Sequence, residues 1–213
     1  MQSIFISATN TDVGKTYTTI KLLNYFAKQG LSVGVYKPIE TGVVDTPLDA
    51  SLLLSEVQKV NPNFKQLCTN DITAYTFAIP SAPFCADIDR VIDIDVIIEK
   101  YHNLQKRCDI LLVEGAGGLL VPIKRDFMMI DLIQRLNIPT LLVTPSRLGC
   151  INDTLLSIEA LQNRDITFDW CVNLYQDRES FDRVTKPFYD EVFEDWWRVD
   201  SGFDKLNFKR EHI

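Results

Sequence analysis

Two short stretches of the chain carry residue types that bind phosphate and metal ions. One ends in Gly14-Lys15-Thr16, and the other is Glu114 to Gly117. The first lies between an apolar run and a segment of helical period, where first-turn amides point at an anion. Glycine lets the backbone approach phosphate, lysine can reach the β- and γ-phosphates, and a threonine hydroxyl can bind Mg²⁺. This pattern predicts a triphosphate site, although Thr9 stands where the strict phosphate-loop pattern has glycine.

Three charged residues are further candidates, each with an alternative role. Glu114 ends an apolar segment and precedes a predicted turn, so its carboxylate either binds Mg²⁺ or faces solvent. Lys37 leaves a strand on the stiff turn that Pro38 imposes, where it either neutralises an anionic intermediate or is a solvated surface lysine. Asp49 begins a helical segment, where the commoner role of an acid is to complement the helix dipole.

Thr41 and the segment Gly149-Cys150-Ile151-Asn152 are candidates for substrate binding. The Thr41 hydroxyl either bonds to a polar substrate or only forms the turn in which it lies. The free amides that begin the helix after Gly149 could hold a carboxylate. Alternatively, Asn152 or Asp153 caps that helix, which is the commoner case.

Strand-like and helical segments alternate along the chain, and they must position these residues. The alternation predicts right-handed βαβ units, with helices covering both faces of the sheet. We predict an α/β, three-layer fold of the P-loop NTPase type, with a mostly parallel central sheet whose strand ends gather the candidate residues. The predicted strands are Ser3 to Ser7, Ser32 to Tyr36, Asp109 to Glu114, Thr140 to Thr144 and Phe168 to Leu174. The predicted helices are Lys15 to Gln29, Leu48 to Lys59, Asp93 to Lys106, Met128 to Arg135, Asn152 to Asn163 and a core-packing or interface helix within Tyr189 to Val199.

Composition narrows the class of protein. A chain of 213 residues suits one domain, and we expect residues 1–213 to form it. The net charge of -7 argues against broad binding to nucleic acid or anionic membrane, so small molecules are the expected partners. The five cysteines show no metal-site spacing. The chain start does not resemble a signal peptide, and no apolar run approaches the roughly 20 residues that span a bilayer, so we expect a cytoplasmic protein.

Taken together, four motifs in order resemble those of the dethiobiotin synthetase family. They are the phosphate loop Ala8 to Thr16, the turn Lys37-Pro38, the run Glu114 to Gly118 and the segment Gly149 to Asn152. The resemblance covers roughly Met1 to Leu174. It implies an ATP- and Mg²⁺-dependent ligase that closes a cyclic urea from 7,8-diaminopelargonic acid and CO₂, through a carbamate that accepts the γ-phosphoryl group.

The same resemblance implies a role for each candidate residue. The catalytic residues would be Lys37, Lys15 and Thr11, and the Mg²⁺ ligands Thr16, Asp49 and Glu114. ATP would contact Asp12, Val13, Gly14, Lys15, Thr16, Tyr17, Asp49, Glu114, Gly115, Ala116, Gly117 and Asn173. The substrate would contact Thr41 and, from the neighbouring subunit of a homodimer, Gly149, Cys150, Ile151 and Asn152.

The chain departs from the family pattern at two positions. Ala8 replaces the usual first glycine, and Leu174 replaces the aspartate that follows the base-binding asparagine. A nucleotide switch of the partitioning or cell-division type is the alternative, but such proteins carry a lysine where this chain has Asn10. An amide-forming ligase acting on a larger cofactor precursor would usually need a glutamine-hydrolysing domain, for which the chain has no room.

Overall fold

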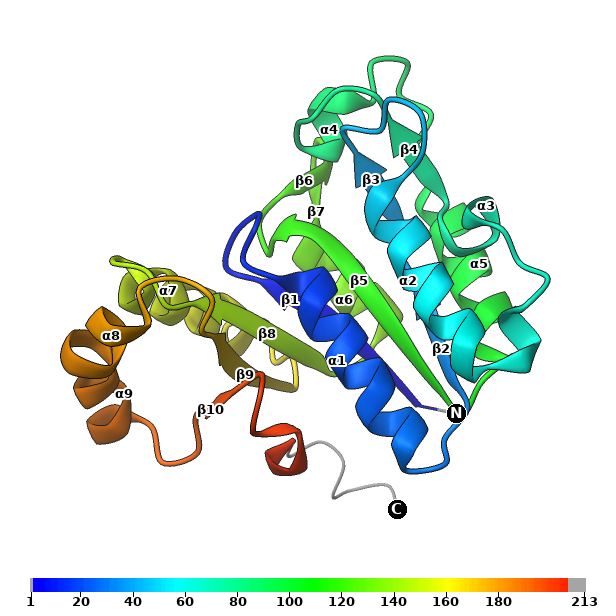
Figure 1. Cartoon of the computed structure of the whole chain (residues 1–213). Helices are drawn as coiled ribbons and strands as arrows, with labels where there is room; N and C mark the ends of the chain where they lie inside the picture. Colours follow the sequence, from blue (N-terminus) through cyan, green and yellow to red (C-terminus); the bar gives the residue numbers. More distant parts are fainter. Residues whose placement is uncertain (1, 207–213) are drawn as a thin grey trace.

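A computed structural model describes residues 2–206, and its centre is a sheet of six parallel strands (Figure 1). The strand order is β10-β9-β8-β1-β5-β2, so β1 lies inside the sheet between β8 and β5. The strands are β1 (Gln2–Ala8), β2 (Val33–Tyr36), β5 (Ile110–Gly118), β8 (Thr140–Pro145), β9 (Phe168–Asn173) and β10 (Trp197–Arg198). Because the strands are parallel, the loops after β1, β2 and β5 all lie at the carboxyl end of the sheet.

Helices connect the strands and cover both faces of the sheet. The longer ones are α1 (Lys15–Lys28), α2 (Leu48–Val60), α5 (Ile94–Gln105), α6 (Met129–Leu136) and α7 (Cys150–Gln162). In the view of Figure 1, α1 and α2 lie in front of the sheet and α6 lies behind it. Shorter helical segments are η1 (Pro62–Phe64), α3 (Thr69–Ile72), α4 (Pro83–Ala86), α8 (Arg178–Ser180), η2 (Phe181–Thr185), α9 (Lys186–Val192) and η3 (Phe203–Lys205).

Two small strand pairs lie beside the main sheet. In one, β3 (Ile39–Thr41) pairs in parallel with β4 (Tyr75–Phe77). In the other, β6 (Pro122–Lys124) pairs antiparallel with β7 (Phe127–Met128). The first pair follows the Lys37-Pro38 turn directly, so it fixes the chain that leaves β2.

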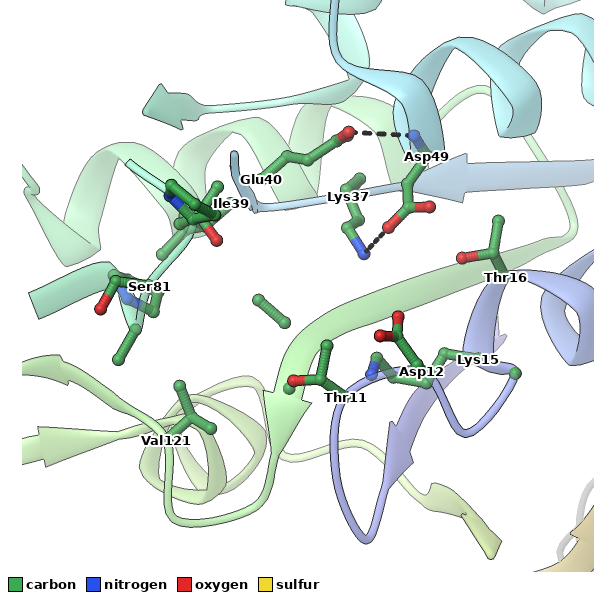
Figure 2. Close-up of a pocket in the computed structure, with 17 residues that line it drawn as sticks. Thr11, Asp12, Lys15, Thr16, Lys37, Ile39, Glu40, Asp49, Ser81 and Val121 are labelled. Carbon is green, nitrogen blue, oxygen red and sulfur yellow. Dashed lines mark hydrogen bonds and ion pairs between the residues drawn. The ribbon is translucent and has the colours of Figure 1, made fainter. Parts of the chain in front are cut away.

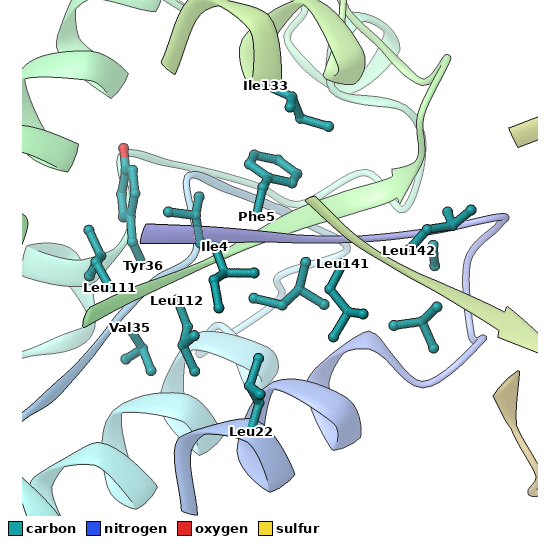
Figure 3. Close-up of a cluster of buried hydrophobic side chains, with 14 of the residues drawn as sticks. Ile4, Phe5, Leu22, Val35, Tyr36, Leu111, Leu112, Ile133, Leu141 and Leu142 are labelled. Carbon is teal, nitrogen blue, oxygen red and sulfur yellow. The ribbon is translucent and has the colours of Figure 1, made fainter. Parts of the chain in front are cut away.

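The core has two layers because successive side chains of a strand point to opposite faces. On one face, Phe5 lies toward Ile133 of α6, and on the other, Leu112 lies toward Leu22 of α1 (Figure 3). All four side chains are almost fully buried. The predicted three-layer α/β fold is therefore confirmed.

Two predicted boundaries were wrong. The strand that was expected to end at Glu114 continues to Gly118, with a register shift where Ile6 pairs with Glu114 but Ala8 pairs with Gly118. Gly115 leaves room for the Phe5 ring on the neighbouring strand, since a Cβ at this position would lie 2.8 Å from it. The segment 189–199 is not one helix, because α9 ends at Val192 and β10 pairs with β9.

Within residues 2–206, no helix is both long enough and apolar enough to cross a bilayer.

Candidate functional site

A cleft of about 600 Å³ opens where β1, β2 and β5 end. Its walls come from the turn before α1, from the chain after β2, from the start of α2 and from the glycine run of β5 (Figure 2). Residues 80–83 close its far side. Segments that are distant in sequence thus meet at one end of the parallel sheet, as the strand order requires.

The turn between β1 and α1 has the geometry of an anion site. Gly14 is the N-cap of α1 with φ of +99°, a left-handed conformation that side-chain-bearing residues rarely adopt. The Lys15 ammonium is buried and donates to the Asn10 carbonyl at 3.3 Å. Asn10 accepts from the Thr11 amide at 2.8 Å through its side chain, so it shapes the turn locally. First-turn amides and a lysine therefore face the same space.

Gly14 is also required by its neighbour on β9. A Cβ at this position would lie 2.1 Å from the Asn173 side-chain nitrogen. That nitrogen donates to the Val13 carbonyl at 2.9 Å. Asn173 therefore supports the phosphate turn, and its side-chain oxygen remains as a further acceptor.

Lys37 lies between two carboxylates at the centre of the cleft. Its ammonium is 2.7 Å from Glu114 Oε1 and 2.9 Å from Asp49 Oδ2, and it also donates to the Gly115 carbonyl at 3.3 Å. The Lys37 side chain is 3% exposed. It is thus an almost fully desolvated cation that the protein holds with three acceptors, and the solvated alternative for Lys37 is wrong.

Glu114 is fully buried and accepts hydrogen bonds on both oxygens. The Thr16 hydroxyl donates to Oε1 at 2.9 Å, and the Thr19 hydroxyl donates to Oε2 at 2.8 Å. Together with Lys37, these donors account for the stability of a carboxylate in the core. The solvent-facing alternative for Glu114 is therefore wrong.

The charges in the cleft shift each other's protonation. Burial acts to lower the pKa of Lys37, but the Glu114 and Asp49 carboxylates outweigh it and raise that pKa. Burial acts to raise the pKa of Asp49, but Lys37 outweighs it and the pKa is lowered. Burial and the nearby Lys37 cation lower the pKa of Lys15 to about 8, although Glu114, Asp49 and Asp12 oppose the change. Lys37 is therefore a fixed cation, whereas the pKa of Lys15 falls to about 8.

The oxygen atoms around Lys37 fit a magnesium site that includes nucleotide phosphates. Thr16, Asp49 and Glu114 supply a hydroxyl and two carboxylates, which are hard donors. Among residues 2–206 there is no cluster of three or more His, Cys, Asp and Glu side chains that would hold a metal alone. Mg²⁺ usually needs only one or two carboxylates when phosphates complete its shell.

Most of the predicted site residues line this cleft, but not all. Those that line it are Thr11, Asp12, Gly14, Lys15, Thr16, Lys37, Thr41, Asp49, Ala116 and Gly117. Glu114 and Gly115 do not line the cleft, but both accept a hydrogen bond from Lys37, which does. Val13 is buried. Tyr17 is half exposed, and its hydroxyl donates to Asp200 Oδ1 at 2.7 Å.

The segment from Gly149 to Asn152 does not line the cleft of its own chain. It begins α7, and Gly149 is the N-cap with φ of +91°. The alternative that Asn152 or Asp153 caps this helix is wrong, since both residues lie within it. The glycine takes the cap because the chain turns there in a left-handed conformation.

Sequence reasoning missed three residues that support the site. Thr19 lies one turn after Thr16 on α1, a spacing that would have placed both hydroxyls on one face. Glu40, between Lys37 and Thr41 in sequence, accepts from the Asp49 and Ala50 amides at 2.9 Å each. Asp200 contacts Tyr17, and no local pattern around it indicates this.

Comparisons with known proteins agree with this geometry. A family described as AAA domain matches residues 2–172. The chain is 64% identical over 206 residues to the ATP-dependent dethiobiotin synthetase BioD of Sulfurovum sp., covering 97% of this chain and 98% of the relative. It is 40% identical over 209 residues to the protein of the same description from Wolinella succinogenes, covering 97% and 96%.

Solved structures that resemble the chain share its fold at low identity. A plasmid partition protein from Borrelia burgdorferi aligns with a TM-score of 0.61 at 8% identity, covering 100% of this chain and 99% of that one. The MinC:MinD cell division complex of Aquifex aeolicus aligns with a TM-score of 0.53 at 17% identity, covering 89% and 77%. These structural similarities support the P-loop type of fold. The family follows from the sequence identity to the two dethiobiotin synthetases. The chain belongs to the dethiobiotin synthetase family of ATP-dependent ligases.

Proposed function

We propose that this protein carboxylates 7,8-diaminopelargonic acid with CO₂ and closes the ring to dethiobiotin, using ATP and Mg²⁺ and releasing ADP and phosphate. The intermediates are a carbamate and a carbamic-phosphoric anhydride. The observation that carries the proposal is the position of the Lys37 ammonium, which lies on the cleft wall beside Lys15 and the phosphate turn. Both cations are buried, so their fields act strongly on an anion in the cleft.

Carbamate formation requires a neutral amine that attacks carbon dioxide. Nearby ammonium groups disfavour the protonated substrate amine and favour the carbamate anion that forms. Lys37 keeps its charge because Glu114 and Asp49 raise its pKa. The same cations therefore favour both the neutral substrate amine and the carbamate that forms from it. Thr11 and Thr41 also line the cleft, and we assign them to the substrate head.

Phosphoryl transfer to the carbamate then needs positioning and charge neutralisation. The amides of Asp12 to Thr16 hold the phosphates, and Lys15 reaches toward the transferring group. Thr16, Asp49 and Glu114 would hold Mg²⁺, which would neutralise charge on the phosphate oxygens. Attack of the second amine on the anhydride carbon closes the urea ring and expels phosphate.

A homodimer forms part of the proposal. The Cys150 amide donates to the Arg147 carbonyl at 3.1 Å, whereas the amides of Ile151 and Asn152 lack intrahelical partners, so these two suit the substrate carboxylate. Because Gly149 to Asn152 do not line their own cleft, they are assigned to the site of the neighbouring subunit. The adjoining Leu148 is 89% exposed in the isolated chain, which is consistent with a covering partner.

Turnover by the purified protein tests the proposal. The reaction contains the diamine, bicarbonate, Mg²⁺ and ATP, and mass spectrometry detects dethiobiotin while phosphate release is followed. We expect one dethiobiotin for each phosphate, and no phosphate without the diamine. Well-folded protein that releases phosphate but forms no dethiobiotin would contradict the assigned reaction. A panel of nucleotides in the same assay measures preference for the base.

A further inference from the structure

The carboxylate of Glu40 caps a helix to which it does not belong. Glu40 lies on β3 and is 7% exposed, and one of its oxygens accepts from the Asp49 amide at 2.9 Å (Figure 2). Its other oxygen accepts from the Ala50 amide at 2.9 Å. These amides lie in the first turn of α2, where no intrahelical acceptor is available. The residue at the N-cap of α2 is Pro47, whose side chain cannot accept a hydrogen bond. Glu40 therefore supplies the cap from another element.

This cap acts on Asp49 rather than on the helix alone. Glu114 is buried within β5 and has donors on both oxygens, so its orientation is fixed by the core. The Asp49 side chain is 44% exposed, so fewer neighbours fix its orientation, and the position of its backbone matters more. The bond from the Asp49 amide to Glu40 fixes that backbone where the carboxylate reaches Lys37 at 2.9 Å.

The segment that carries Glu40 is itself held firmly. The Lys37 amide donates to the Ile72 carbonyl at 2.8 Å, and the Pro38 carbonyl accepts from the amides of Ala74 at 3.0 Å and Tyr75 at 3.1 Å. Lys37, Glu40 and Thr41 thus belong to one backbone segment tied to α3 and β4. The side chain of Glu40 therefore fixes the start of α2 relative to this segment.

We infer that Glu40 is a positioning residue for Mg²⁺ binding, because its contacts with α2 hold Asp49 in place as a ligand. The inference rests on the proposed function, which takes Asp49 as a metal ligand. Both Glu40 oxygens are engaged with backbone amides, so Glu40 acts through Asp49. Groups that orient metal ligands typically contribute about 10- to 100-fold to metal affinity.

Calorimetric titration of Mg²⁺ into the protein saturated with a non-hydrolysable ATP analogue tests this inference. We expect Glu40→Ala to weaken Mg²⁺ binding by about 10- to 100-fold. Glu40→Gln keeps one acceptor oxygen, so we expect an intermediate loss, and this variant carries the test if Glu40→Ala does not fold. The matched control is Asp93→Ala, because Asp93 caps the 12-residue α5 through the Asp95 amide at 2.9 Å and does not line the cleft. We expect it to lower the melting temperature and leave Mg²⁺ affinity unchanged.

A fourth variant separates failure of the inference from failure of the proposed metal site. If Asp49→Asn leaves Mg²⁺ affinity unchanged, Asp49 is not a ligand and both proposals fall. If Asp49→Asn weakens binding but both Glu40 variants bind Mg²⁺ like the unaltered protein, only the role of Glu40 is overturned. Equal losses in the Glu40 variants and in Asp93→Ala would also overturn it, because they would reflect general destabilisation.

Discussion

The ammonium of Lys37 has three acceptors within 3.3 Å and almost no contact with solvent. The buried ion pair between Lys37 and Glu114 need not add stability. Removal of either residue, however, leaves the other charge buried without a partner, at a cost of about 3–5 kcal/mol. For Glu114, which is fully buried, Lys37 is the only cation that donates to its carboxylate among the described residues. Lys37 thus combines a structural role with its proposed role in turnover.

Replacement of Lys37 by methionine separates these two roles. We expect turnover to fall by at least about 100-fold, because the charge that stabilises the carbamate is lost. Nucleotide binding should remain measurable, since the phosphate turn and Lys15 are unchanged. The measurements are steady-state turnover and calorimetric titration with ATP, with the exposed Lys59→Met as the control. Near-normal turnover would remove Lys37 from its proposed role.

Lys15 should make the stability of the free protein depend on pH. Its pKa is about 8 in the folded protein against an ordinary 10.5, so between these values the folded state binds fewer protons than the unfolded state. Stability from this group therefore rises as pH rises through that interval, and below it the buried ammonium costs up to about 3 kcal/mol.

We accordingly expect Lys15→Met to stabilise the free protein at pH 7 and to gain much less at about pH 10. Urea unfolding at the two pH values, compared with the unaltered protein, measures the difference. The variant should also lose most of its affinity for ATP, because it lacks the cation beside the phosphates. A variant that is less stable than the unaltered protein at pH 7 would contradict the assigned pKa.

At the scale of elements, contacts from the C-terminal third of the chain hold the phosphate turn. The side-chain nitrogen of Asn173 donates to the Val13 carbonyl, and the Tyr175 hydroxyl donates to the Asp12 carbonyl. Asp200, which follows β10, accepts from Tyr17 and pairs with Lys21 at 3.5 Å. These bonds join the end of β9 and the segments that follow β9 and β10 to the turn and to α1, although more than a hundred residues separate them in sequence.

Asn173→Ala tests whether this support matters for binding. We expect the free energy of unfolding to fall by about 1–3 kcal/mol, because the buried Val13 carbonyl loses its donor. Since the lost bond supports the turn, affinity for ATP and for GTP should fall by the same factor. Calorimetric titration with each nucleotide checks this. A loss confined to ATP would show instead that Asn173 contacts the base.

Sequence patterns predicted the elements well where a local period is strong. The five main strands and five long helices were placed within a few residues, because apolar runs and helical spacing are local properties. Residues 115–118 looked like a turn because three of the four are glycine, but they continue β5, and Gly115 lies against the Phe5 ring. The edge strand β10 has only two residues, too few to show a period.

The site was predictable in its residue types but not in its contacts. Lys15, Lys37 and Glu114 were candidates from their turns, and Asp49 became a metal candidate only through the family resemblance. The parallel order of the strands brings these residues together at one cleft. The cap from Glu40 to α2 was not predicted, because it depends on how β3 lies against another element. Contacts between elements of this kind have no signature in a single sequence.

For the molecule as a whole, the strand order separates two parts of the proposed site. The cleft lies on the side of β1 that faces β5 and β2, whereas α7 follows β8 on the other side of β1. In the proposed homodimer, the substrate contacts the cleft of one subunit and the start of α7 in its partner. Closed dimers of this symmetry form two such sites.

Mixing two inactive variants tests this arrangement. Lys37→Met disables the cleft, and Asn152→Glu places a carboxylate where the substrate carboxylate would bind, while an acid in the first turn suits the helix. We expect each variant alone to be inactive. In an equal mixture after subunit exchange, activity should return to about a quarter of normal, because half of the dimers are hybrids and each has one intact site.

The matched control pairs Lys37→Met with Glu114→Gln, since both residues belong to the same cleft. Hybrids of these two variants contain no intact site, so activity should not return. Native mass spectrometry of a tagged subunit establishes that hybrids have formed. If Lys37→Met and Asn152→Glu form hybrids without regaining activity, each subunit binds its substrate alone, and the segment from Gly149 to Asn152 does not serve the partner. If both mixtures regain activity equally, the effect comes from dimer formation rather than from a shared site.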